Sequence, residues 1–236
     1  MTYGEGTVTP HGAPETTLTR PRGEWALIWL GFPLAGAVLG WLLPRLAEWL
    51  VGFDWLPLPG PVELAANLPE LPAAIGGAVL GIVGGVVLAL MSESEYVTVT
   101  VRDDELRTVR DNRPRTVERA NVDAVFVDGK DLVVVGPDAR EVLRQGGDLP
   151  DRERLRAALE EHGFPWMEED PHAEEYRRWV DGLPELSTSA NALLKARAKA
   201  LENDKADDAE ELRSELVALD VMLRDRDGKQ HFRVVR

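Results

Sequence analysis

The sequence predicts a membrane protein built from several parts: a two-helix transmembrane hairpin, a small β-rich domain, and a C-terminal αα-hairpin with a β-hairpin. Three observations predict this class. Two runs of 19 and 21 residues contain no charged side chain. Short alternating segments rich in β-branched residues follow them, and the end of the chain returns to a helical repeat.

Charge divides the 236 residues in the same way. Residues 1–91 hold only 3 of the 27 Lys and Arg and 7 of the 41 Asp and Glu. The net charge of −14 opposes binding to long nucleic acids through phosphate contacts alone, although it leaves room for a small local site. Cysteine is absent from the sequence, which excludes disulfides, thiolate nucleophiles and cysteine-bound zinc.

The two uncharged runs, residues 25–43 and 71–91, are each long enough for a helix to cross about 30 Å of hydrocarbon. Buried core helices are one alternative, and a cleaved signal peptide is another for the first run. Neither run has the polar face of a soluble helix, and the first has no small-x-small cleavage site. We therefore expect two spans, after a disordered tail over residues 1–24 that is rich in Thr, Gly and Pro.

Residues near the ends of the runs predict how the hairpin lies in the membrane. Five of the seven tryptophans fall between Trp25 and Trp55, as in an interfacial aromatic belt. Between the runs, helical spacing predicts either a segment along the interface or a loop against the hairpin, from Leu46, Trp49, Leu50 and Phe53. Five arginines flank the runs on the outside against only Arg45 between them: Arg20, Arg22, Arg102, Arg107 and Arg110. This bias predicts that both termini are cytosolic.

Small residues recur at four-residue spacing within both runs. One helical face of the second run carries Gly77, Gly81 and Gly85, and Gly36 and Gly40 give the first run the same option. Such faces let helix backbones approach closely where lipid supplies no hydrophobic drive. We expect the two spans to pack on each other through these glycines, with homo-oligomerisation through the same faces as the alternative.

Residues 92–166 predict antiparallel hairpins closed by one helix. The strands alternate in YVTVTV, ELRTVR and DAVFVDGKDLVVVG, with a turn at Asp128-Gly129. Asp151 is the predicted N-cap of the closing helix, and Gly163 ends it. For residues 167–187 we expect a helix and a linker, with Asp170 as the cap and Pro171 in the first position. A metal site is the alternative for the polar residues of this segment, Glu168, Glu169, Asp170, His172 and Glu174. Acidic residues also suit the positive end of a helix, and we predict no metal.

The segment from residue 188 to 236 predicts two helices, broken at ENDK, and a closing β-hairpin. With VFVDGKDLVVV, ALEEHGFPW and this segment in view, nearly the whole chain resembles the actinobacterial YqeB-like membrane proteins. That resemblance implies two spans, a bacterial PH-like domain and a C-terminal helical module. It implies no activity, and the arginines of the β domain alternate with acids, which does not favour a phosphoinositide pocket.

The last module itself resembles the C-terminal anticodon-binding domain of cysteinyl-tRNA synthetases, through RAKALENDKADDAEELRSELVALDVMLRD and an aromatic-Arg pair. The resemblance implies RNA contacts at Asp225, Phe232 and Arg233. Two departures stand against it, since Phe232 replaces a tryptophan and Asp220 replaces a glycine. Base stacking would need Phe232 exposed, whereas a structural role would need it buried.

The sequence therefore favours a non-enzymatic membrane protein that displays the PH-like domain and the C-terminal module to a protein partner in the cytosol. The alternative is a membrane-tethered protein that binds tRNA or another RNA through the last module. We expect no catalytic residues and no cofactor, because the four histidines and the carboxylates form no recognisable catalytic motif.

Overall fold

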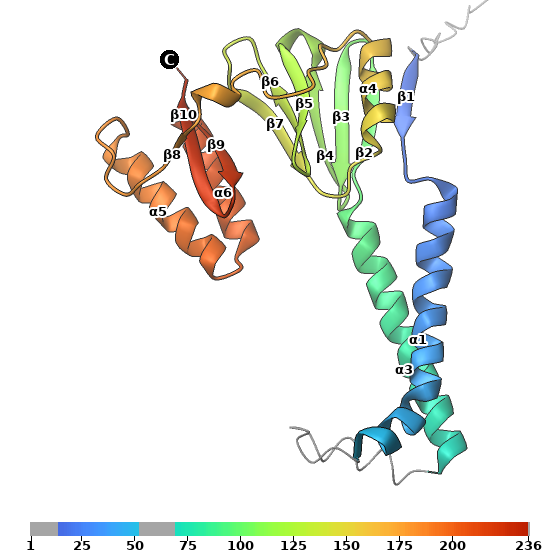
Figure 1. Ribbon diagram of the computed structural model, residues 1–236. Helices are drawn as coiled ribbons and strands as arrows, with labels where there is room; N and C mark the ends of the chain where they lie inside the picture. Colours follow the sequence, from blue (N-terminus) through green and yellow to red (C-terminus); the bar gives the residue numbers. More distant parts are fainter. Residues whose placement is uncertain (1–13, 52–68, 236) are drawn as a thin grey trace, which may run out of the picture. The chain divides into compact units, whose positions relative to one another are not determined.

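The computed structural model describes residues 14–51 and 69–235 (Figure 1). They form two compact units. The helical unit comprises Thr19–Tyr96 together with Arg110–Asn112. The second unit, called the body below, comprises the described residues up to Leu18, Val97–Val109 and the chain from Arg113 onward.

Two long apolar helices make up the helical unit, α1 (Arg22–Val51) and α3 (Glu70–Glu95). Both are long and apolar enough to cross a membrane, over Arg22–Leu42 and Leu71–Glu95. Only 6% and 17% of their most apolar stretches are buried, so large side chains such as Leu27 and Leu80 are exposed. Helix α1 includes most of the predicted interfacial segment, while Phe53 and Trp55 lie outside the described residues.

The predicted glycine faces lie where α1 meets α3. A Cβ atom built on Gly36 would overlap the carbonyl oxygen of Gly81, and one built on Gly40 would overlap that of Gly77. A Cβ atom on Gly85 would overlap the backbone of α1 at Phe32. The two helices therefore touch backbone to backbone, at a separation that only glycine permits at these positions.

The PH-like part of the body consists of two antiparallel sheets. The first has the order β1 (Glu15–Leu18), β2 (Thr98–Arg102), β3 (Glu105–Arg110) and β4 (Arg113–Glu118). After the 3-10 turn η1 (Arg119–Asn121), the second has the order β5 (Ala124–Asp128), β6 (Asp131–Val135) and β7 (Glu141–Gly146). The turn predicted at Asp128-Gly129 joins β5 to β6, with Gly129 at a φ of 65°.

Strand β1 corrects the prediction of a disordered tail. Residues 15–18 pair antiparallel with β2, and Leu18 is 4% exposed in the core. Helix α1 also begins at Arg22, before the predicted start of the span. The chain thus leaves the sheet at Leu18, runs through α1 and α3, and re-enters the sheet as the neighbouring strand.

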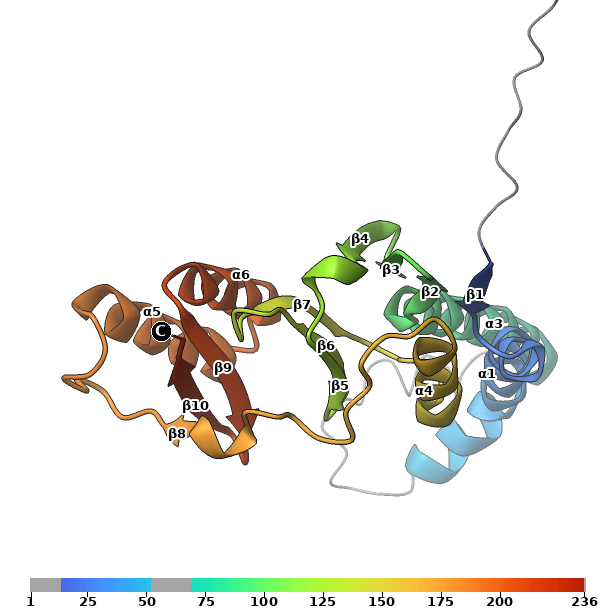
Figure 2. The ribbon, with the colours of Figure 1, turned by 90° about the horizontal axis from the view of Figure 1, so that it is seen from above.

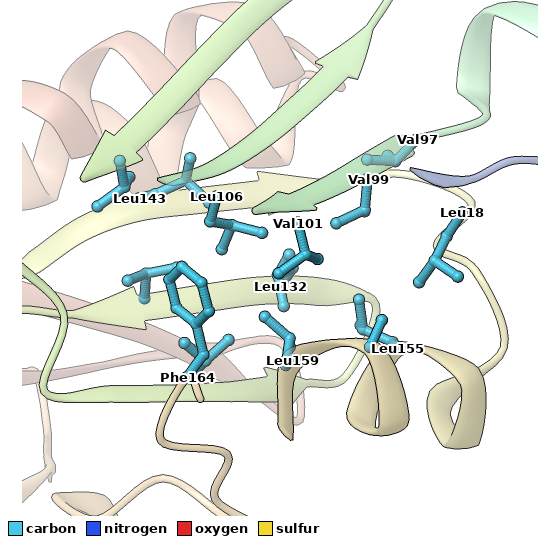
Figure 3. Close-up of a cluster of buried hydrophobic side chains, with 14 residues drawn as sticks. Leu18, Val97, Val99, Val101, Leu106, Leu132, Leu143, Leu155, Leu159 and Phe164 are labelled. Atoms are coloured by element: carbon cyan, nitrogen blue, oxygen red, sulfur yellow. The ribbon is translucent and has the colours of Figure 1, made fainter. Parts of the chain in front are cut away.

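The closing helix α4 (Arg152–Glu161) covers the core of the two sheets. Asp151 caps it as predicted, since its carboxylate accepts a hydrogen bond from the Arg154 N–H, and Gly163 follows its end with a φ of 70°. Figure 3 shows Leu155 and Leu159 of this helix among the buried side chains of the strands. This apolar stripe fixes the helix on the sheets.

The segment after α4 differs from the prediction. Asp170 does not cap an α-helix; its Oδ1 accepts a hydrogen bond from the His172 N–H at 2.8 Å, which closes a turn. The single 3-10 turn η2 (Ala173–Glu175) and the short strand β8 (Arg177–Arg178) follow. Strand β8 pairs with a strand from the end of the chain, so a long-range partner replaces the local helix.

The C-terminal module has the predicted order: α5 (Thr188–Glu202), α6 (Ala206–Ala218), β9 (Val221–Arg226) and β10 (Lys229–Val234). Ser187 caps α5 by accepting a hydrogen bond from the Ala190 N–H. The strands form a sheet in the order β8-β10-β9. Figure 2 shows α5 and α6 on one side of this sheet, where they share a buried apolar cluster with it.

Candidate functional site

Strand β10 sends its successive side chains to opposite faces of the sheet, and this separates the predicted RNA contacts. Phe232 faces the helices and is 0% exposed, in a cluster with Leu194, Leu216 and Leu223. The guanidinium of Arg177 lies 5.6 Å from the centre of its ring. A nucleic-acid base needs an exposed aromatic plane, so in this structure the Phe232 ring serves the core of its own module.

Asp225 is held by two buried arginines of its own module. Its carboxylate contacts Arg197 at 2.6 Å and Arg213 at 3.2 Å, and Arg197 also donates to the amide oxygen of Gln230 at 2.8 Å. Burial alone would raise the pKa of Asp225, but hydrogen bonding and charge from Arg197, with Arg213, outweigh burial and lower the pKa. The carboxylate is 39% exposed, and these contacts fix it as an anion at the surface of its own module.

Arg233 points to the other face of β10 and joins the module to the PH-like domain. Its guanidinium donates a hydrogen bond to the carbonyl oxygen of Ala139, in the β6–β7 loop, and lies 5.6 Å from the ring centre of Tyr176. The Tyr176 hydroxyl in turn donates to Glu141 at 3.3 Å. Burial and the nearby Glu141 charge raise the pKa of Tyr176, which keeps its hydroxyl protonated as a donor.

A network of arginines and carboxylates continues across the contact between the module and the PH-like domain. Arg224 of β9 pairs with Asp128 of β5 at 2.8 Å, and Arg213 of α6 lies 3.9 Å from Glu141 of β7. On the PH-like side, Arg144 of β7 pairs with Asp131 and Glu141 at 2.8 and 2.9 Å. Burial alone would lower the pKa of Arg144, but these carboxylates outweigh burial and raise the pKa. Removing one member of such a buried set leaves the others uncompensated, at a cost of about 3–5 kcal/mol.

A buried contact between Glu141 and Met222 adds to this attachment. The Glu141 N–H donates to the Met222 sulfur at 3.3 Å, and Met222 is fully buried.

Strands β5 and β6 are buried on both faces, because a second cluster lies opposite the main core: Ala124, Phe126, Val133 and Val135. The continuous apolar runs in VFVDGKDLVVV fit strands covered on both sides.

An open groove lies beside this contact, between β4, β7 and α6. It has a volume of about 480 Å³, and Arg115, Val142, Arg213 and Ser214 are among the residues that line it. Arg115 crosses its edge to donate a hydrogen bond to the carbonyl oxygen of Arg144. In the described sheets no strand pairs with the outer edge of β4 or with the outer edge of β7. The groove can therefore present backbone groups as well as mixed charges.

Sequence reasoning missed a hydrogen-bonded set around His162. The buried ring of His162 lies 2.6 Å from Asp103 through Nδ1 and 3.0 Å from the Thr16 hydroxyl through Nε2. A hydroxyl, an imidazole and a carboxylate in this order also occur in hydrolases. Here they connect the residue that caps the end of α4, the β2–β3 turn and strand β1. Only the pairing of β1 with β2, two segments far apart in the sequence, places Thr16 near His162, so the sequence alone could not identify this set.

No group of three or more His, Cys, Asp and Glu side chains could hold a metal ion among the residues that the structure describes. In the sequence, Glu141, Arg144 and Arg213 look like ordinary surface charges. Only their contacts with one another identify them as the attachment between the two parts of the body.

The fold and this attachment define a class of protein. It has two apolar helices, a bacterial PH-like domain, and an anticodon-binding-like module attached to that domain. Comparison with known families agrees, since residues 16–167 match the YqeB-like bacterial PH domain and residues 183–233 match the cysteinyl-tRNA ligase anticodon binding domain. The chain is 30% identical to the uncharacterised protein YqeB of Bacillus subtilis (strain 168), over 87% of this chain and 86% of the relative. The chain belongs to the YqeB-like family. No solved structure matches it.

Proposed function

We propose that this chain is a non-enzymatic integral membrane protein with two spans and both termini in the cytosol. Its function is to display one rigid body, made of the PH-like domain and the C-terminal module, to a protein partner. The observation that carries the proposal is the exposure of the apolar side chains on α1 and α3. Apolar helices of this length with so little burial need a surrounding that water does not provide.

The connection between the helices and the body supports the orientation. Strands β1 and β2 are neighbours in one sheet, yet one precedes α1 and the other follows α3. A helical hairpin whose two outer ends join neighbouring strands of one sheet has both ends on the same side of the membrane. The arginines outside the hairpin then favour the cytosol for this side.

The contacts of the C-terminal module favour display to a protein partner over RNA readout by the predicted residues. Asp225 and Phe232 are used inside the module, and Arg233 is used to attach it to the PH-like domain. A binding surface held on a rigid support loses less conformational entropy when a partner binds. The groove between β4, β7 and α6 is the part of the body that offers unpaired strand edges to such a partner.

The experiment uses the absence of cysteine from the natural sequence. Single cysteines are placed at Lys130, in the β5–β6 turn, and at Leu58, between the two helices, and intact cells receive a membrane-impermeant maleimide. The proposal expects the chain in the carbonate-resistant membrane fraction, labelling of Leu58→Cys in intact cells, and labelling of Lys130→Cys only after lysis. A carbonate-soluble chain, or the reverse labelling, would contradict it.

The match of residues 183–233 to an anticodon binding domain favours RNA binding as a second candidate. Its test is a titration of the full chain in detergent with labelled cysteine tRNA and total tRNA. Saturable binding that survives Phe232→Leu and is lost in charge variants would establish an RNA-binding protein without base stacking on Phe232. The display function expects no saturable binding.

A further inference from the structure

The sheet β8-β10-β9 has a second face, opposite the one that carries Phe232. Directly opposed residues of neighbouring strands share a face, and the pairing places Arg178, His231 and Arg224 in one row across the three strands. The next row of the same face holds Arg226 opposite Lys229. All five side chains of these two rows are therefore basic, whereas the preceding row of the same face, Met222 opposite Arg233, is buried against the PH-like domain.

Most basic side chains of this face form no ion pair with an acidic residue that the structure describes. Arg224 is paired with Asp128, and the charge of Asp227 lies in the adjoining turn. Arg178, Arg226 and Lys229 are exposed, and none of them makes an ion pair or a side-chain hydrogen bond with a described residue. Like charges placed directly opposite each other in a sheet are destabilising. In a chain with a net charge of −14, such a face fits an anionic surface.

Two observations favour lipid over RNA as that surface. The aromatic ring of this sheet, Phe232, lies on the opposite face and is buried, so the basic face offers phosphate contacts without a stacking platform. The spans would also keep the body next to lipid headgroups at a high effective concentration, a step that rests on the proposed function. Helix α3 ends at Glu95 and β2 begins at Thr98, so the tether is short.

We propose that the basic face, carried by Arg178, Arg226 and Lys229, docks on the anionic lipid headgroups of the membrane that holds the chain. A basic side chain at an anionic surface favours the docked state about fivefold. Removing three such charges lowers the ratio of docked to undocked body about 100-fold. High salt weakens the docking in the same direction, because it screens exposed charges.

The test uses the full chain in vesicles of phosphatidylcholine alone or with 30% phosphatidylglycerol. A fluorophore on Val180→Cys, just after β8, reports exposure to the neutral quencher acrylamide. We expect protection from acrylamide in the anionic vesicles only, and its loss at 0.5 M salt. The triple variant Arg178→Gln, Arg226→Gln, Lys229→Gln loses the protection. A matched triple variant at exposed positions elsewhere keeps it: Arg107→Gln, Arg154→Gln and Lys199→Gln.

Other results would overturn the docking. Equal quenching in both vesicle types, or equal loss in both triple variants, would show that this face does not dock on lipid. Protection by total tRNA in neutral vesicles, without protection by phosphatidylglycerol, would assign the face to RNA instead. Flotation of the vesicles in carbonate reports the spans separately. Protection in anionic vesicles without carbonate-resistant flotation would support lipid docking while contradicting the two spans.

Discussion

Replacing Phe232 by alanine tests whether the aromatic residue expected to meet RNA is instead part of the core. The ring is 0% exposed and packs with Leu194, Leu216 and Leu223. Truncation of a fully buried Phe to Ala lowers the free energy of unfolding by about 3–5 kcal/mol, through lost burial and the cavity that remains. With a denaturant slope of about 2 kcal/mol per molar urea, the unfolding midpoint falls by about 2 M.

The assay is pulse proteolysis of the full chain in detergent across a urea series, which measures the folded fraction of the body. The matched control is Leu201→Ala in the same module, where the side chain is 42% exposed. We expect a change of no more than about 0.5 kcal/mol for this control. A similarly small change for Phe232→Ala would refute the reasoning, because it would mean that the ring lies free at the surface.

Three further predictions concern other parts of the chain. Gly81→Leu should force α1 and α3 apart, which is measured as a longer distance between spin labels on the two helices. The control Gly84→Leu, where a Cβ atom has open space around it, should leave that distance unchanged. Equal effects of the two substitutions would contradict the glycine contact. Because the pKa of Asp225 lies below its ordinary 3.8 in the folded state, its contribution to stability is complete above about pH 4 and is lost as the pH falls through the lowered value. The difference in unfolding free energy between the natural chain and Asp225→Asn should therefore shrink below pH 4, and a pH-independent difference would contradict this. His162→Ala removes two hydrogen bonds and should speed hydrogen exchange in β1, measured by mass spectrometry; unchanged exchange would show that they do not hold the strand.

The parts of the fold that sequence predicts well are those with strong local signals. The two uncharged runs, the Asp128-Gly129 turn and the Asp151 cap each depend on a few neighbouring residues, and the structure has all of them. The αα-hairpin and the closing β-hairpin also follow from local periodicity. Such features need little information from the rest of the chain.

The features that sequence did not predict depend on distant partners. Strand β1 is four residues long and is defined by its pairing with β2, which comes after both helices in the sequence. The segment after Asp170 has helix-compatible residues, but the edge of β10 pairs with Arg177 and Arg178 instead. The sequence left open whether the Phe232 side chain is exposed or buried. The alternation of side chains along β10 places it on the buried face. The arginine network likewise becomes visible only once both parts of the body are placed.

The most direct test of the central claim, that the PH-like domain and the C-terminal module form one displayed body, is a distance between them in the membrane. Spin labels on Lys130→Cys and Lys199→Cys, both exposed positions, would be measured in the full chain in lipid nanodiscs by pulsed electron resonance. We expect one narrow distance distribution, which broadens when Arg224→Ala and Arg233→Ala remove two contacts of the attachment. A broad distribution in the natural chain, unchanged by these substitutions, would contradict it.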